Sequence, residues 1–224
     1  GINAASFEWL KDLQTTCKKH DVLLIIDDIQ AGCGRTGSYF SFEEAGLYPD
    51  IVTLSKSLGG YGLPFAMVLI RPEIDQWKPG EHNGTFRGNS FAFVTAKAAI
   101  DTYWSDDNFS KDIKRKGAYV SNRLEAIIDQ YGEGNFTTRG RGMFQGINCV
   151  NSDLAGKITH KAFLKNMIIE TSGADDQVVK FLCPLIISDE NLKKGLDIVE
   201  QAIKEVCAKE DSIPEEKDYF SVDD

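Results

Sequence analysis

Residues 22–30 read Val-Leu-Leu-Ile-Ile-Asp-Asp-Ile-Gln, and this stretch decides the fold of the chain. Residues 22–26 form an uninterrupted apolar run, which is typical of a β-strand buried on both faces. A glycine-rich turn at 31–37 and a second short apolar run at 51–54 follow it. Because a helical pattern precedes the first run, the order of elements predicts an α/β layered fold.

The segments around these two strands extend the pattern. Between Ser6, a candidate N-cap, and His20, a helix is predicted by apolar residues at i, i+3 and i+7: Leu10, Leu13 and Cys17. Residues 65–70 are strand-like. Asn89 is a candidate cap of another helix, whose apolar face comprises Phe91, Val94, Thr95 and Ala98.

The pattern changes after a polar turn at 105–108. A long amphipathic helix is predicted from Ile113, Val120, Leu124, Ile127 and Ile128, and a final helix from Leu192, Leu196, Val199, Ile203 and Val206. Strand-like segments lie between them at 143–150, 167–171 and 178–182. We therefore expect one domain over 1–108, a smaller α+β domain over 109–208, and a solvated acidic tail over 209–224.

Composition and charge exclude several classes of protein. The chain has 224 residues, 34 acidic against 25 basic, and a formal net charge of −9. A content of 42% hydrophobic and 26% charged residues is typical of a soluble globular protein. The acidic balance argues against nucleic acid or an anionic membrane as a partner. No apolar run approaches the roughly 18 residues that a membrane-spanning helix needs.

The cysteines and histidines point to a reducing compartment without a zinc site. The five cysteines are scattered and never form a CxxC pair, and the three histidines are equally dispersed. A cytoplasmic protein is the simplest interpretation. The chain begins at Gly1-Ile2-Asn3 without an initiator methionine, which suggests a processed or partial chain.

Gly32, Gly34 and Gly37 fit the GxGxxG fingerprint of dinucleotide-binding proteins. That motif needs a helix at its third glycine, yet the aromatic residues 38–42 that follow lack helical periodicity. The acidic residue expected after the next strand is also missing. A tight turn that needs positive φ angles accounts better for these glycines.

Asp27 and Lys56 form a more informative pair. Each lies just past the carboxyl end of an apolar strand, where open α/β sheets place their ligands. A lysine amine can form a Schiff base with pyridoxal phosphate, while a carboxylate keeps the pyridine nitrogen protonated. From the residues alone, this chemistry competes with a simpler role as polar residues that end the strands.

Four motif blocks, at 24–30, 32–37, 49–52 and 54–57, resemble in order and spacing the class III pyridoxal-phosphate aminotransferases. The resemblance implies the fold type I of PLP-dependent transferases, with residues 1–108 as the C-terminal part of the large cofactor-binding domain. Asp28 stands where many family members carry glutamate, which is a mild departure.

The resemblance also implies roles for single residues. Lys56 matches the lysine that forms the internal aldimine, and Asp27 matches the partner of the pyridinium nitrogen. Ile29 matches the branched residue packed against the ring, and Gln30 the amide near the ring hydroxyl. Thr85 matches the threonine that reaches the cofactor phosphate of a neighbouring subunit.

Residues 64–70, 77–89 and 168–176 resemble one branch of this family more closely. That branch implies transfer of the amino group of L-glutamate to L-aspartate 4-semialdehyde. The products are L-2,4-diaminobutyrate and 2-oxoglutarate, in the first step of ectoine biosynthesis. Another class III ω-aminotransferase, of the ornithine, acetylornithine or γ-aminobutyrate type, remains an alternative.

The chain departs from the family at one substrate contact. Lys180 stands where many members carry an arginine that binds a substrate carboxylate. Lysine lacks the planar fork of arginine, so carboxylate recognition should differ in geometry. Arg87 and Arg141 are further candidates, although a structural role is favoured for both.

The resemblance covers only the C-terminal half of the family length. We expect the phosphate-binding turn and the ring-stacking aromatic residue to lie in the other half. A complete protein is expected to be a homodimer or a larger homo-oligomer that acts on amino acids and oxo acids. The alternative for these 224 residues is an inactive folded fragment with exposed apolar strand edges.

Overall fold

The computed structural model describes residues 1–60, 62–85, 87–132 and 134–208. The predicted acidic tail at 209–224 lies outside the described residues. The helices are α1 (Phe7–Lys19), the 3₁₀-helix η1 (Lys56–Gly59), α2 (Ser90–Tyr103), α3 (Asn108–Tyr131), α4 (Ser152–Leu164) and α5 (Asp189–Cys207). The strands are β1 (Ile25–Asp27), β2 (Ile51–Leu54), β3 (Met67–Ile70), β4 (Phe136–Arg141), β5 (Phe144–Cys149), β6 (Glu170–Ser172) and β7 (Val178–Phe181).

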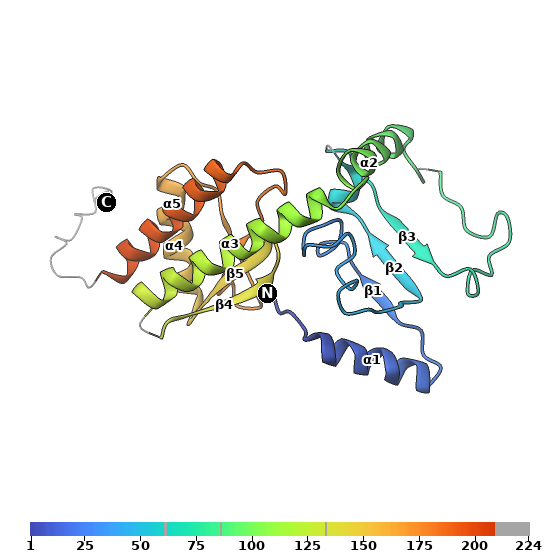
Figure 1. Cartoon of the computed structure of the whole chain (residues 1–224), viewed down its shortest axis with the longest axis horizontal. Coiled ribbons are helices and arrows are strands. Elements are labelled where there is room, and N and C mark those ends of the chain that lie inside the picture. Colours follow the sequence, from blue (N-terminus) through green and yellow to red (C-terminus); the bar gives the residue numbers. More distant parts are fainter. Residues whose placement is uncertain (61, 86, 133, 209–224) are drawn as a thin grey trace, which may run out of the picture.

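The strands form two sheets that lie in different halves of the molecule, and α3 extends from beside the first sheet into the half that contains the second (Figure 1). In the first sheet, of order β1-β2-β3, β1 and β2 are parallel, and β3 is antiparallel to β2. The parallel pair places Asp27 opposite Thr53. The carboxyl ends of β1 and β2 therefore lie at the same edge of this sheet.

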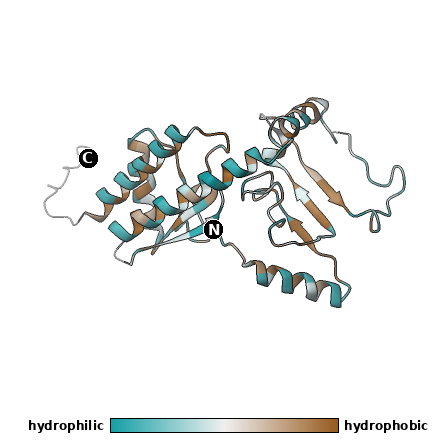
Figure 2. Ribbon diagram, viewed as in Figure 1, coloured by the Kyte–Doolittle hydropathy of each residue, from teal (hydrophilic) through white to brown (hydrophobic). Residues whose placement is uncertain are grey.

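The apolar run at 22–26 predicts a strand buried on both faces, and this prediction is wrong for most of the segment. The strand is limited to Ile25–Asp27, and 58% of Ile25 is exposed. Val22 and Leu23 are also exposed, whereas Leu24 is buried. β1 is an edge strand of the described sheet, so one of its sides has no neighbouring strand. Figure 2 shows the hydrophobic colouring of β1 and β3.

The predicted caps of α1 and α2 are confirmed. The Ser6 hydroxyl accepts a hydrogen bond from the backbone N–H of Trp9 at 3.2 Å, and Asn89 Oδ1 accepts one from that of Phe91 at 2.9 Å. The apolar face predicted for α2 is not buried, because Phe91 and Val94 are 75% and 67% exposed. The helix instead buries Ala92 and Ala96, since its small residues allow close approach to η1.

The second sheet has the order β4-β5-β7-β6, and neighbouring strands are antiparallel. The alternation predicted for β5 is confirmed, because four side chains at every second position are buried: Met143, Gln145, Ile147 and Cys149. Helices α3, α4 and α5 contribute to the same core. Two elements of this half were not predicted from the sequence. The first is β4, which is mostly polar, and the second is α4, whose buried Ala155, Ile158 and Ala162 recur at helical spacing.

Arg35, in the glycine-rich turn, links the two sheets. Its buried guanidinium donates to the backbone oxygens of Met143 at 3.3 Å and Cys183 at 2.6 Å, and its own backbone oxygen accepts from Met143 N–H at 2.9 Å. Gly142 packs so closely that an added Cβ would lie 2.6 Å from the carbonyl carbon of Thr36. Gly37, with a φ of 114°, begins no helix, which agrees with a tight turn and not with a dinucleotide-binding motif.

Candidate active site

Asp27 lies at the end of β1 with one carboxylate oxygen held in place. Its Oδ1 accepts hydrogen bonds from the backbone N–H of Ile29 at 3.0 Å and from the hydroxyl of Thr53 at 3.1 Å. No donor from the described residues reaches Oδ2 in a hydrogen bond. Asp27 is exposed, so its carboxylate is oriented through Oδ1 and remains accessible to a ligand through Oδ2.

Lys56 begins η1, two residues after the end of β2, and its side chain is exposed. Its φ of 51° places it in the left-handed region, which is uncommon for a residue with a side chain. Such strain persists only where the surrounding structure fixes the backbone, and it is frequent at active sites.

Two hydrogen bonds fix the backbone around Lys56. The Ser55 hydroxyl donates to the backbone oxygen of Phe65 at 2.8 Å, and the Thr95 hydroxyl of α2 donates to that of Gly59 at 2.8 Å. Gly60 then turns the chain with a φ of 68°, and a Cβ there would lie 2.8 Å from the Thr95 backbone oxygen. The lysine is therefore presented by a tightly packed turn.

The structure places Asp27 and Lys56 at one edge of the sheet but in different cavities. Lys56 and Arg87 line an open cavity of about 900 Å³. Asp27 and Arg141 line another, of about 360 Å³. The sequence prediction that the acid and the amine lie at neighbouring strand ends is confirmed, and each of these two cavities contains one of them.

The other predicted cofactor contacts lie in two segments. Ile29 and Gln30 are half-buried directly after Asp27, and the backbone of Ile29 holds the Asp27 carboxylate. Thr85 is exposed, in the loop between β3 and α2. Ile29 and Gln30 therefore lie in the segment that carries Asp27, whereas Thr85 lies in a separate loop.

Both arginine candidates have contacts with neighbouring loops. Arg87 donates to the backbone oxygen of His82 at 2.7 Å, within its own loop. Arg141 donates to the backbone oxygen of Ser41, and its guanidinium lies 4.8 Å from the centre of the Phe7 ring. These contacts agree with the structural role that the sequence analysis favours for both arginines.

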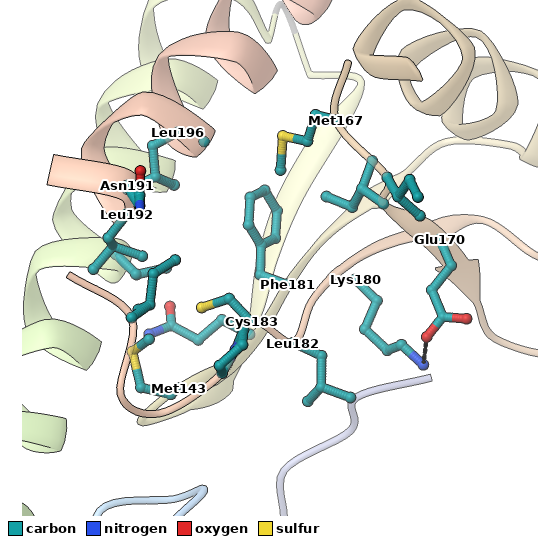
Figure 3. Close-up of a pocket in the computed structure, with 17 residues that line it drawn as sticks. Met143, Met167, Glu170, Lys180, Phe181, Leu182, Cys183, Asn191, Leu192 and Leu196 are labelled. Carbon is teal, nitrogen blue, oxygen red and sulfur yellow. Dashed lines mark ion pairs between the residues drawn. The ribbon is translucent and has the colours of Figure 1, made fainter. Parts of the chain in front are cut away.

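Lys180 is paired with a residue that sequence reasoning missed. Its Nζ lies 2.6 Å from Oε1 of Glu170, its register partner on β6, and the two side chains lie together in Figure 3. Lys180 lowers the pKa of the Glu170 carboxyl through this hydrogen bond and its charge, and the charge of Lys56 acts in the same direction.

Asp28, the residue directly after Asp27, is a buried acid that is only 1% exposed. Its Oδ2 accepts from the backbone N–H of Ser41 at 3.0 Å, while Oδ1 has no partner among the described residues. Burial raises the pKa of the Asp28 carboxyl, with an opposing effect of the Ser41 hydrogen bonds. The sequence showed the substitution at this position but not its burial.

The described ranges contain neither a candidate membrane span nor a candidate metal cluster. None of their helices is long and apolar enough to cross a membrane. These ranges also contain no cluster of three or more His, Cys, Asp or Glu side chains that could hold a metal ion.

The chain is similar to known aminotransferases. The family model "Aminotransferase class-III" matches residues 1–203. The diaminobutyrate–2-oxoglutarate transaminase of Vibrio parahaemolyticus is 56% identical over 93% of this chain and 50% of its own length. The enzyme of the same name from Halomonas elongata is 58% identical over 92% of this chain and 49% of its own length.

A solved ornithine aminotransferase from Toxoplasma gondii, with PLP at partial occupancy in its active site, has the same fold. It aligns with a TM-score of 0.83 and 28% identity over 92% of this chain and 49% of its own. The expected fold type I is thereby confirmed. The chain spans about half the length of the curated relatives it matches. On these motifs, this fold and the family match over residues 1–203, the chain belongs to the class III aminotransferase family.

Proposed function

We propose that the protein transfers the amino group of L-glutamate to L-aspartate 4-semialdehyde, giving L-2,4-diaminobutyrate and 2-oxoglutarate. The observation that carries the proposal is the placement of Asp27 and Lys56 after the carboxyl ends of two adjacent parallel strands. The names of the relatives that are 56% and 58% identical to this chain support the choice of substrates.

The residues present fit pyridoxal 5'-phosphate as the cofactor. Lys56 offers an exposed amine for covalent attachment, and Asp27 offers an oriented carboxylate for the ring nitrogen. Ile29 would pack against the ring, and Gln30 would lie near the ring hydroxyl. Thr85 would bind the phosphate in a neighbouring subunit.

The cofactor supplies an electron sink that lets a C–H bond of the bound amino acid ionise. The Asp27 carboxylate would lie beside the ring nitrogen, where its charge would favour the protonated ring. Thr53 and the Ile29 N–H fix the direction of that charge. The Lys56 amine would accept and return the proton at the substrate carbon that bears the amino group.

We further propose that the protein is a homo-oligomer that acts on small amino acids and oxo acids in the cytoplasm. The exposed Phe91 and Val94 on α2 provide apolar surface suited to contact with another subunit. The assignment of Thr85 to a neighbouring subunit's site requires such contact. The scattered cysteines support a reducing compartment.

Borohydride reduction tests the cofactor assignment. The protein is incubated with pyridoxal phosphate, reduced and digested, and the modified peptide is identified by mass spectrometry. We expect selective labelling at Lys56 and its loss in Lys56→Ala, whereas Lys97→Ala, which changes an exposed lysine on α2, should keep it. Selective labelling at another lysine, or none, would reject the role of Lys56.

Product analysis tests the substrates. Glutamate is supplied with aspartate semialdehyde, and the amine product is identified by chromatography. We expect diaminobutyrate to form faster than products from ornithine, acetylornithine or γ-aminobutyrate as donors. A preference for one of those donors would replace the proposed substrates with another ω-aminotransferase activity.

A further inference from the structure

A cavity of about 480 Å³ lies where the two halves of the molecule meet, and the proposed function makes no use of it. Its lining residues come from the glycine-rich turn, η1, α2, the start of α3 and the segment 184–186 between β7 and α5. Neither Asp27 nor Lys56 is among them. This junction cavity has a volume typical of sites for small molecules.

Arg35 contributes a buried positive charge to the junction cavity. It is only 8% exposed, and it is the one charged residue among the described residues of the lining. Burial lowers the pKa of the Arg35 guanidinium, and the opposing charge effect comes from Cys183 and not from a carboxylate of the described ranges. Buried charges in proteins are normally paired with an opposite charge, so the described part of the chain leaves room for an anion at Arg35.

The hydrogen bonds of Arg35 leave part of its guanidinium unused. Its bonds to the backbone oxygens of Met143 and Cys183 both start from Nη1. No described residue accepts a hydrogen bond from its Nε or Nη2. An arginine presents these donors in a planar fork that matches the two oxygens of a carboxylate. A carboxylate can therefore bind Arg35 while Nη1 keeps its two links to the second half.

The rest of the junction cavity is mostly apolar and partly aromatic. The ring of Trp104 contacts those of Tyr39 and Phe109 edge-on, with centroids 5.1 Å and 5.5 Å apart, and all three residues line the cavity. Leu58 and Leu185 add aliphatic surface. This lining favours a ligand with one charged end and an apolar body, because a second charge would lose its hydration without gaining a partner.

We propose that the junction cavity binds a small monocarboxylate with an apolar body, whose carboxylate pairs with Arg35 and whose body packs against Trp104 and Phe109. Glutamate and 2-oxoglutarate carry two carboxylates, so they do not match a lining with one charged residue. The ligand is thus of a different class from the substrates of the proposed reaction, and this inference does not depend on that reaction.

The position of the junction cavity gives binding a structural consequence. Ser57, Leu58 and Gly60 line it and belong to the turn that presents Lys56, whereas residues 184–186 belong to the other half. A ligand there would contact both parts at once. Binding should therefore raise the Tm of the protein, because the ligand binds the folded state and not the unfolded chain.

Isothermal titration calorimetry with three probes tests the ligand class. The probes are 3-phenylpropionate, 3-phenylpropanamide and acetate. The amide keeps the apolar body without the charge, and acetate keeps the charge without the body. We expect the amide and acetate each to bind about tenfold or more weakly than 3-phenylpropionate. The amide thereby tests the charged contact without a substitution of Arg35, which would also break its links between the sheets.

A matched pair of isoleucines locates the bound probe. Ile186 and Ile168 are 63% and 90% exposed, so replacing either one by alanine should leave the fold intact. Ile186 lines the junction cavity, whereas Ile168 lines the cavity of about 390 Å³ that contains Lys180. Ile186→Ala should weaken the binding of 3-phenylpropionate about threefold, and Ile168→Ala should leave it unchanged. The reverse order would place the probe at Lys180 and overturn the proposal.

A second matched pair fills the cavity. Ala98 on α2 and Ala118 on α3 are both exposed, and only Ala98 lines the junction cavity. Ala98→Leu should weaken the binding of 3-phenylpropionate about tenfold, because the larger side chain takes up space that the ligand needs. Ala118→Leu should bind it like wild type, and both variants should unfold at a Tm close to that of wild type without ligand.

Three other results would overturn the proposal. The first is no binding of 3-phenylpropionate by wild type, and the second is equal affinity for the acid and its amide. The third is binding by Ala98→Leu that equals binding by Ala118→Leu. A rise in Tm with 3-phenylpropionate that is lost in Ala98→Leu would support the proposal independently of the calorimetric Kd values.

Discussion

The hydroxyl of Thr53 donates a 3.1 Å hydrogen bond to the carboxylate of Asp27, its register partner on the neighbouring parallel strand. Thr53 lies three residues before Lys56. One strand pair therefore determines both the direction of the acid and the position of the amine. Asp27 would act on the cofactor itself, and Thr53 would position it.

Thr53→Val should lower kcat about fivefold, because the Asp27 carboxylate loses one of its two holding hydrogen bonds. Borohydride labelling at Lys56 should be retained, because the amine is untouched. Thr53→Ser should restore kcat, since it replaces the hydroxyl. Steady-state kinetics on the three proteins checks this, and a kcat equal to wild type in Thr53→Val would remove Thr53 from the site.

Arg35→Ala should lower the free energy of unfolding by ~3 kcal/mol, because the carbonyls of Met143 and Cys183 lose their buried donor. Urea denaturation followed by fluorescence measures the loss. Arg71→Ala is the control, because Arg71 forms a partly exposed ion pair with Asp50 at 3.3 Å, worth at most about 1 kcal/mol. Equal losses in the two variants would show that Arg35 does not link the sheets.

Gly60→Ala should destabilise the protein more than Gly62→Ala and should reduce labelling at Lys56. Both glycines have positive φ angles, 68° and 73°, so both variants share the backbone strain of about 1–3 kcal/mol. Only Gly60 adds a steric conflict, with a Cβ 2.8 Å from the Thr95 backbone oxygen, whereas Gly62 has open space. Thermal unfolding and peptide mapping compare them, and identical behaviour would argue against a packing role for Gly60.

The free energy of unfolding of Asp28→Asn, relative to that of wild type, should increase as the pH rises. The pKa of Asp28 in the folded state lies above its ordinary value of 3.8, so the folded state holds the proton over a range where the unfolded state has lost it. Stability from Asp28 is therefore fully present below 3.8 and is lost as the pH rises through the folded pKa.

The measurement for Asp28 is the difference in unfolding free energy between wild type and Asp28→Asn from about pH 4 to pH 7. Taking the difference removes the opposite contributions of acids such as Glu170 and Asp112, whose pKa values are lowered by basic partners. A difference that is constant with pH would show that burial does not perturb Asp28.

The local sequence determined the elements that carry the site. Ser6 and Asn89 cap α1 and α2, because a capping bond needs only residues two or three positions apart. The apolar run 51–54 coincides with β2. Asp27 ends β1, and Lys56 lies two residues after the end of β2. These features follow from chain periodicity and from the chemistry of single residues, so they are visible without coordinates.

Only the tertiary structure decided which distant residues meet and which apolar residues face solvent. Arg35 reaches Cys183 across 148 positions, and Glu170 meets Lys180 because the register of β6 and β7 places them opposite each other. Ile25 and Phe91 are apolar yet exposed, since burial depends on neighbouring elements and not on hydrophobicity alone. The sequence thus determined the candidate acid and amine, while strand register and packing determined that Glu170 and Lys180 form an ion pair across neighbouring strands.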